Sequence, residues 1–211
     1  MKKYFAWLLI GALGYACNQE NQTGKTLSEN TDAMTADAET ETETKKIPEL
    51  SIYNLPSTWT TQDNEEIKLE DLYGDVLVMT MIYTTCPTAC PRLIADMKYV
   101  ESLIPEEDAD KVKFVTVSID PETDTPQRLK EFAEMNNMVG EKWVFLRGTP
   151  DDTREFANVL AVSYKKISPM QFSHSNIISV FDEKGVMVFQ KEGLNVDYHS
   201  IVDAVKKEIH N

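Results

Sequence analysis

Two cysteines, Cys86 and Cys90, lie four residues apart in the stretch YTTCPTACPRL, which covers residues 83–93 and has a proline after each cysteine. Such a pair can form a disulfide bond, act in thiol-disulfide exchange or bind a soft metal ion. At the start of a helix, residues four apart point the same way with Cβ atoms roughly 5–6 Å apart, so two sulfurs can converge on one ion. The Cα separation of about 6 Å also suits a disulfide bond. Metal binding and oxidation therefore compete, because only the reduced pair can bind metal.

The elements around the pair predict where it lies. Residues 76–83 (VLVMTMIY) form a nearly continuous apolar run, which is typical of a central strand covered on both faces. Apolar residues then recur at helical spacing over residues 91–103. The cysteines therefore lie where a buried strand turns into a helix, and the positive end of the helix dipole would stabilise their thiolates. Met79 and Met81, inside the apolar run, are expected to pack in the core rather than to bind metal.

The rest of the chain alternates between strand and helix patterns. We expect strands at residues 112–119 and 143–146, helices from 124 or 125 to 138 and from 149 to 160, a hairpin of 177–181 with 186–190, and a last helix over 197–209. Asp124 and Thr125 are both candidates for the cap of the first of these helices. The order predicts an α/β domain with a mixed central sheet flanked by helices. The cysteines would lie at the carboxyl end of a central strand, where such sheets place their sites.

Size and charge exclude some classes of protein. The chain has 211 residues, 42% of them hydrophobic, which suffices for one well-packed domain and appendages. Its net charge of -14 would repel nucleic-acid phosphates, and no lysine or arginine cluster compensates. We therefore expect no nucleic-acid partner.

The N-terminal segment has the pattern of an export signal. Two lysines precede the apolar residues 4–13, a run shorter than the roughly 20 residues needed to span a bilayer. Small residues lead up to Cys17, as at the processing site of bacterial lipoproteins, where the cysteine is lipidated. We interpret residues 1–17 as a signal peptide or lipoprotein anchor, with an uncleaved anchor as the alternative. Each of these places the protein outside the cytoplasm, and a lipidated or uncleaved segment would anchor it at the membrane on the periplasmic side.

The next segment, residues 18–46, is rich in Thr, Glu, Asp, Asn and Ala and contains no aromatic residue. Such a composition predicts a disordered acidic linker. A flexible coil of this length has a root-mean-square span on the order of 30 Å, enough to hold a folded domain off a membrane. The folded domain is expected to cover residues 47–211.

Three stretches together resemble the Sco/SenC family. They are YTTCPTACPRL, VSIDPETDTPQRLKEF at residues 117–132 and FSHSNIISVFDEKG at residues 172–185, in the family's order and at about its spacing. The resemblance runs from about residue 50 to the end. It implies a thioredoxin-like fold with an N-terminal hairpin extension, anchored at a membrane on the exported side.

The family resemblance also implies a function. Its members bind copper through the two cysteines and one distant histidine and serve assembly of the binuclear copper centre of cytochrome c oxidase. By that match Cys86, Cys90 and His174 would be the ligands, and cytochrome c oxidase subunit II or another copper protein would be the partner. The donor types agree, because two thiolates favour Cu(I) and an added imidazole can also hold Cu(II). Structural zinc usually needs four protein ligands, and no fourth is obvious.

Three other residues are candidates for roles near such a site. Asp120 and Asp124, in the second stretch, would either interact with groups next to the ligands or face a partner. Alternatively, Asp124 would cap a helix. Met170, four residues before His174, is a candidate for transient copper contact. Two further classes of protein remain open: a thiol-disulfide oxidoreductase that reduces cysteines of the oxidase subunit or another exported protein, and a peroxidase-like enzyme. The three-residue spacer differs from the two-residue spacer of typical thioredoxins, and no separate resolving cysteine lies elsewhere.

Overall fold

The domain is built on a mixed sheet of seven strands. The computed structural model describes residues 46–169, 171–194 and 197–210, and all structural statements refer to these residues. The strands follow the order β2 (Glu66–Lys68), β1 (Thr58–Thr61), β5 (Trp143–Arg147), β4 (Val112–Ser118), β3 (Val76–Ile82), β8 (Ile177–Phe181) and β9 (Met187–Glu192). Strands β3, β4 and β5 run parallel, whereas every other neighbouring pair is antiparallel. The predicted mixed sheet is therefore present, with the N-terminal hairpin β1–β2 at one edge.

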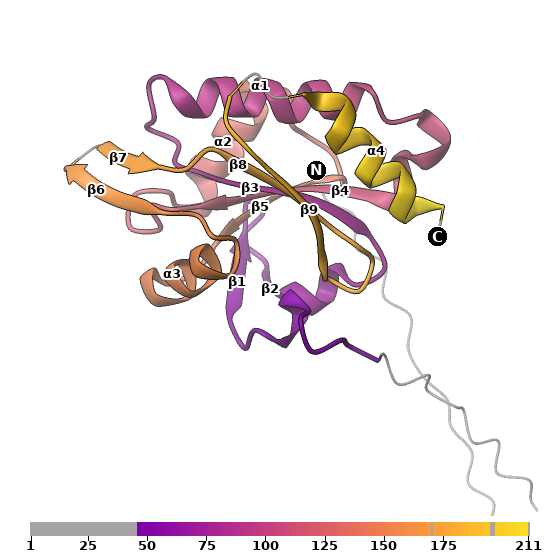
Figure 1. Cartoon of the computed structure of the whole chain (residues 1–211). Helices are drawn as coiled ribbons and strands as arrows, with labels where there is room; N and C mark the ends of the chain where they lie inside the picture. Colours follow the sequence, from indigo (N-terminus) through magenta and orange to yellow (C-terminus); the bar gives the residue numbers. More distant parts are fainter. Residues whose placement is uncertain (1–45, 170, 195–196, 211) are drawn as a thin grey trace, which may run out of the picture. The chain divides into compact units, whose positions relative to one another are not determined.

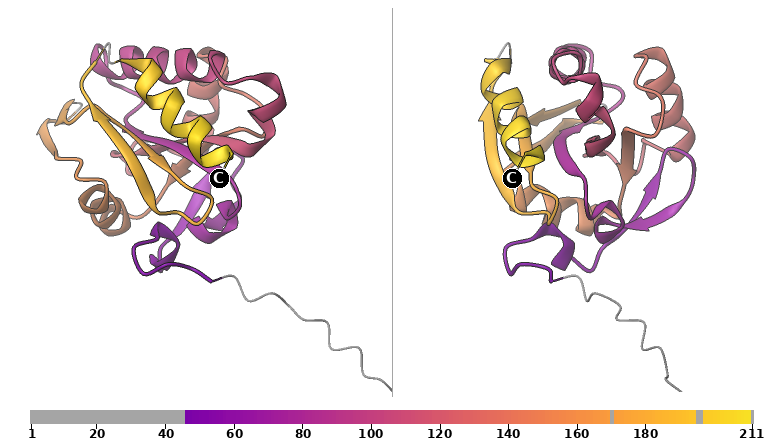
Figure 2. Two further views of the ribbon diagram at one scale, coloured as in Figure 1. Left: turned by 45° about the vertical axis from the view of Figure 1, so that its right-hand side comes forward. Right: turned by 90° about the vertical axis from the view of Figure 1, so that its right-hand side faces the viewer.

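Four α-helices cover this sheet. They are α1 (Ala89–Ser102), α2 (Pro126–Met135), α3 (Pro150–Val159) and α4 (Tyr198–Ile209). Helices α1, α2 and α4 lie on one side of the sheet and α3 lies on the other (Figures 1 and 2). The described residues also form three short 3₁₀ helices: η1 (Ile52–Asn54) before β1, η2 (Leu69–Leu72) between β2 and β3, and η3 (Glu106–Lys111) between α1 and β4. None of the described helices is both long enough and apolar enough to cross a membrane.

Strand β3 lies at the centre of the hydrophobic core. All seven of its residues are buried, as the continuous apolar run predicts for a strand with helices on both faces. It pairs along its whole length with β4, from Val76 opposite Val112 to Ile82 opposite Ser118. Met79 and Met81 are buried in this core, so the prediction that they pack there is confirmed.

The start of α2 agrees with one of the two predicted caps, whereas its end differs from the predicted one. Thr125 caps the helix, since its side chain accepts a hydrogen bond from the backbone N–H of Arg128, whereas Asp124 does not cap it. The helix ends at Met135 rather than at Met138. Asn137 then adopts a left-handed conformation with φ 52°, a common way to terminate a helix.

A second, two-stranded sheet was not predicted from the sequence. Strands β6 (Tyr164–Ser168) and β7 (Gln171–His174) form an antiparallel hairpin that is separate from the main sheet. Its side chains are exposed or half-buried. The sequence of the hairpin accordingly has no long apolar run, which is the pattern that would indicate buried strands. The proposed anchor with Cys17, nearly all of the acidic linker and Met170 lie outside the described residues.

Candidate metal centre

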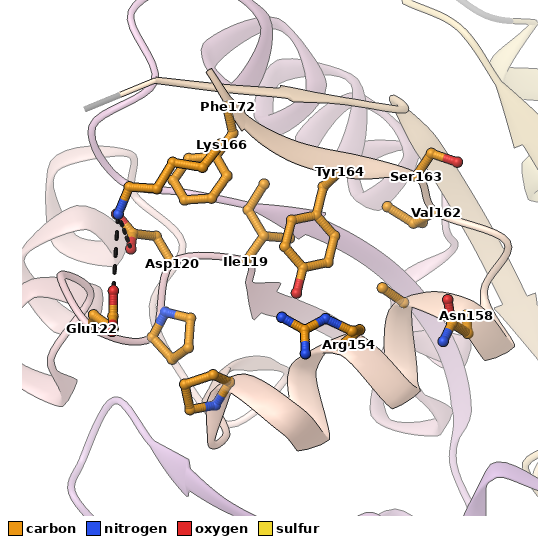
Figure 3. A pocket seen from close by; sticks show the side chains of 13 residues that line it. Ile119, Asp120, Glu122, Arg154, Asn158, Val162, Ser163, Tyr164, Lys166 and Phe172 are labelled. Atoms are coloured by element: carbon orange, nitrogen blue, oxygen red, sulfur yellow. Dashed lines mark ion pairs between the residues drawn. The ribbon is translucent and has the colours of Figure 1, made fainter. Parts of the chain in front are cut away.

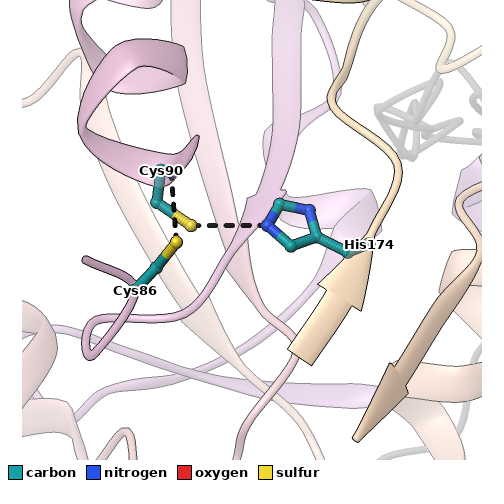
Figure 4. Close-up of side chains that lie close together, drawn as sticks. All are labelled: Cys86, Cys90 and His174. Carbon is teal, nitrogen blue, oxygen red and sulfur yellow. Dashed lines mark hydrogen bonds between the residues drawn. The ribbon is translucent and has the colours of Figure 1, made fainter. Parts of the chain in front are cut away.

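The fold brings together the three side chains that the resemblance indicates. One ligand atom from each of Cys86, Cys90 and His174 lies within 4.8 Å of the other two (Figure 4). Cys86 is in the loop after β3, Cys90 is in the first turn of α1, and His174 is the last residue of β7. Both cysteines are buried and neither is in a disulfide bond. The site is thus made from two distant parts of the chain.

The Cys86 sulfur lies at the N-terminus of α1. A turn brings it there, in which the Cys86 N–H donates to the Tyr83 carbonyl at 3.2 Å. The Cys90 N–H then donates to Cys86 Sγ at 3.3 Å. Burial alone would raise the pKa of Cys86, but hydrogen bonds from the backbone N–H groups of Cys90 and Thr88 and from the side chains of Cys90 and Tyr83 together outweigh it, and the pKa lies below its usual value. Cys86 is therefore the more readily ionised thiol.

Cys90 has the opposite character. Its side chain is fully buried, and burial raises the pKa of the Cys90 thiol far above its usual value, although a backbone hydrogen bond from Tyr83 opposes this. The neighbouring Cys86 raises it further, because two thiolates side by side repel each other. A bound cation would remove this repulsion and favour the loss of both protons.

The His174 ring is oriented for metal binding. Its Nδ1 lies 2.9 Å from the Ser175 carbonyl oxygen. Since a carbonyl can only accept, Nδ1 carries the hydrogen and Nε2 presents its lone pair to Cys90. Nε2 lies 3.5 Å from Cys90 Sγ. Burial lowers the pKa of His174 despite the Ser175 hydrogen bond, which keeps the imidazole neutral, the form that binds metals.

These donors suit copper better than a hard cation. Two thiol sulfurs and an imidazole nitrogen prefer soft or borderline metals, whereas Mg²⁺ and Ca²⁺ require oxygen ligands. An ion about 2.0–2.3 Å from each donor needs donors roughly 3.5–4 Å apart, close to the separation found here. Three ligands would leave a position open for exchange with a partner.

Asp124 stabilises the cysteine loop through hydrogen bonds. Its carboxylate is fully buried and accepts hydrogen bonds from the Thr84 hydroxyl at 2.5 Å, the Thr84 N–H at 3.2 Å and the Ser118 hydroxyl at 2.6 Å. Burial raises the pKa of Asp124, although the hydrogen bonds from Ser118 and Thr84 oppose the shift. Thr84 lies two residues before Cys86, so Asp124 holds the loop that presents this cysteine.

Asp120 lies beside a different feature. It borders a pocket of about 580 Å³ whose lining includes Lys166 and Phe172 of the β6–β7 hairpin but none of the three candidate ligands (Figure 3). Its carboxylate is 4.0 Å from Lys166 Nζ, which is also 3.9 Å from Glu122. Asp120 thus contacts the hairpin that carries His174.

Sequence reasoning missed several residues around the site. It did not single out Tyr83, Thr84 or Ser118, because their contacts depend on the fold. It also missed the hairpin, whose one local signal is Ser168 followed by Pro169, a pair that favours a turn.

Comparisons with known proteins agree with this geometry. The SCO1/SenC family model matches residues 48–210. The SCO1 protein homolog of Bacillus subtilis is 31% identical over 155 residues, which is 72% of this chain and 80% of the relative. The mitochondrial SCO1 homolog 1 of Arabidopsis thaliana is 28% identical over 159 residues, 73% of this chain and 46% of the relative.

Solved structures show the same fold. BsSco, described as a Sco-family cytochrome c oxidase assembly protein with a disulfide switch, has a TM-score of 0.67 and 29% identity, covering 76% of this chain and 95% of its own. A SCO1/SenC family lipoprotein from Bacillus anthracis has a TM-score of 0.67 and 28% identity, covering 74% and 95%. Arabidopsis thaliana ScoI with copper bound has a TM-score of 0.65 and 25% identity, covering 75% and 98%. The predicted thioredoxin-like fold is therefore confirmed, and the chain belongs to the SCO1/SenC family.

Proposed function

We propose that this protein binds copper through Cys86, Cys90 and His174 and delivers it during assembly of the binuclear copper centre of cytochrome c oxidase. The observation that carries the proposal is the convergence of two sulfurs and one imidazole nitrogen within 4.8 Å. Copper bound to Arabidopsis thaliana ScoI and the description of BsSco as an oxidase assembly protein support it. The recipient would be subunit II or another copper protein.

An anaerobic copper titration of the reduced full-length chain tests copper binding. In a Cys17→Ser background, Cys86 and Cys90 are the remaining thiols. We expect one copper per chain and, with Cu(II), an absorption band from sulfur-to-copper charge transfer. Loss of a group that merely supports a ligand costs about 10–100-fold in metal affinity, so His174→Ala should weaken Cu(II) binding by at least that factor.

His199→Ala is the matched control, because His199 is exposed on α4. This variant should bind Cu(II) as the parent chain does. An unchanged stoichiometry and Cu(II) spectrum in His174→Ala would refute the three-ligand model.

A second candidate function is thiol-disulfide exchange with an exported protein. The lowered pKa of Cys86, where backbone and side-chain hydrogen bonds together outweigh burial, favours it. Cys86 would attack the target disulfide and Cys90 would release the target, leaving a disulfide here and two thiols on the target. Insulin reduction by the copper-free chain, with Cys86→Ser as the control, separates this activity from copper delivery.

We also propose the division into an anchor at residues 1–17, a linker at 18–46 and the domain at 47–211. The Bacillus anthracis relative is described as a lipoprotein, which supports lipidation at Cys17. Export would place the domain at the periplasmic side of the membrane. Radiolabelled palmitate should be incorporated in cells that express the parent chain, and Cys17→Ser should abolish this incorporation.

A further inference from the structure

The histidine and the two cysteines belong to separate structural units. His174 ends the β6–β7 hairpin, which pairs with no strand of the main sheet, whereas the cysteines lie at the junction of β3 and α1. The side chains of the hairpin are half-buried or exposed. The distance between His174 and the sulfurs therefore depends on the contacts that join the hairpin to the cysteine loop.

Tyr83 supplies such contacts on both sides. It directly follows β3 and is 3% exposed. Its hydroxyl is 3.3 Å from the backbone nitrogen of Phe172 and 3.4 Å from the Phe172 carbonyl oxygen, so it can accept from one and donate to the other. Its ring centroid lies 5.1 Å from that of Phe172 and 5.8 Å from that of His174. On the other side, its carbonyl accepts from the Cys86 N–H at 3.2 Å.

We propose that Tyr83 is a positioning residue, whose hydroxyl holds the β6–β7 hairpin so that His174 faces the two sulfurs. A phenylalanine would keep the ring contacts but would lose both hydrogen bonds to the backbone of β7. The hairpin would then move more freely relative to the cysteines. This inference rests on the proposed copper binding only for its second test.

The first test is hydrogen exchange in the reduced, copper-free, full-length chain, comparing the parent with Tyr83→Phe. The Phe172 N–H loses its acceptor, so its exchange should become roughly three- to tenfold faster, the factor that corresponds to one ordinary hydrogen bond. Amides in the middle of β3 should exchange as in the parent, which shows that the domain remains folded.

Tyr164→Phe is the matched control. Tyr164 lies on the same hairpin, and its hydroxyl points into the neighbouring pocket toward Arg154 (Figure 3), where it makes no hydrogen bond to a described residue. This variant should leave the exchange of the Phe172 N–H unchanged. Unchanged exchange in Tyr83→Phe, or equal acceleration in both variants, would overturn the proposal.

The second test is Cu(II) affinity in a double-mutant cycle. Tyr83→Phe should weaken Cu(II) binding several-fold in the parent and clearly less in the His174→Ala background, because the ligand that it positions is then absent and only the contact of the hydroxyl with Cys86 remains. An effect of equal size in both backgrounds would mean that the hydroxyl acts through the cysteines, which contradicts the proposal. If no variant binds Cu(II) but exchange responds as expected, the proposed function fails and the positioning role stands.

Discussion

Replacing Thr84 by valine should loosen the cysteine loop from the domain. Valine keeps the branched shape of threonine but removes the hydroxyl that donates to Asp124 at 2.5 Å. The Thr84 N–H and the Ser118 hydroxyl remain as donors. One buried carboxylate therefore loses one of its donors while its surroundings stay otherwise the same.

The expected cost follows from the burial of this carboxylate. A hydrogen bond to a charged group contributes about 1.5–3 kcal/mol, and Asp124 is fully buried, so solvent does not screen the interaction. The hydroxyl also accepts from exposed Arg128 at 3.3 Å, a contact that adds little. We expect Thr84→Val to lower the free energy of unfolding by about 1.5–3 kcal/mol at neutral pH.

The loss of stability caused by Thr84→Val should also depend on pH. Burial raises the pKa of Asp124 in the folded state, so the domain loses stability, relative to the unfolded chain, as the pH rises through that value. The Thr84 hydroxyl holds this pKa down, and its removal raises the pKa further. The variant therefore loses more stability than the parent on the same rise in pH. Below the folded-state pKa the difference should shrink to that of a neutral hydrogen bond, about 0.5–1.5 kcal/mol.

Urea unfolding of the reduced full-length chain, at neutral pH and at stepwise lower pH, measures this difference. Thr85→Val is the matched control, because Thr85 is the adjacent residue, is also half-buried, and its hydroxyl makes no hydrogen bond to a described residue. Equal unfolding midpoints for the two variants would refute the role of Asp124 in holding the loop. A difference that stays constant as the pH falls would refute the ionised state of Asp124.

Two further predictions concern the thiols and one tight turn. At neutral pH, iodoacetamide should modify Cys86 in a Cys90→Ser chain about tenfold faster than it modifies Cys90 in a Cys86→Ser chain, because Cys90 is fully buried and burial raises its pKa. Mass spectrometry measures both rates, and equal rates would contradict the conclusion that Cys86 is the more readily ionised thiol. Gly185→Ala should destabilise the domain by about 1–3 kcal/mol more than Gly74→Ala in urea unfolding. Both glycines have positive φ, but a Cβ at Gly185 would lie 2.8 Å from Ser51 Oγ, whereas one at Gly74 meets no atom within 4 Å.

Much of the fold could be predicted because its main elements have strong local patterns. The apolar run of β3 indicated a buried strand, and Thr149 with Asp152 forms a capping box at the start of α3, where the sequence predicts that a helix begins. The β6–β7 hairpin could not be predicted, since its side chains are too exposed to leave a pattern. The end of α2 was predicted too late, because apolar Met138 continued the helical period past the left-handed Asn137.

For the site, local sequence and tertiary structure contributed different parts. The sequence by itself determined that Cys86 and Cys90 share the start of a helix after a buried strand, because a four-residue spacing and an apolar run are local properties. It left open whether the pair forms a disulfide bond, exchanges thiols or binds metal. His174 entered only through the family resemblance, because it lies 84 residues from Cys90 and no local pattern connects them.

Only the tertiary structure decided how these groups meet. Pairing of β8 with β3 brings the chain back beside the cysteines, so that His174 presents Nε2 to Cys90. The tertiary structure also brings Asp124 into hydrogen-bond contact with Thr84, whereas the sequence equally allowed Asp124 to cap α2. The physical reason is that hydrogen bonds and metal-ligand distances depend on atoms within a few ångströms of one another, and contacts between residues far apart in the sequence are set by how the whole sheet packs.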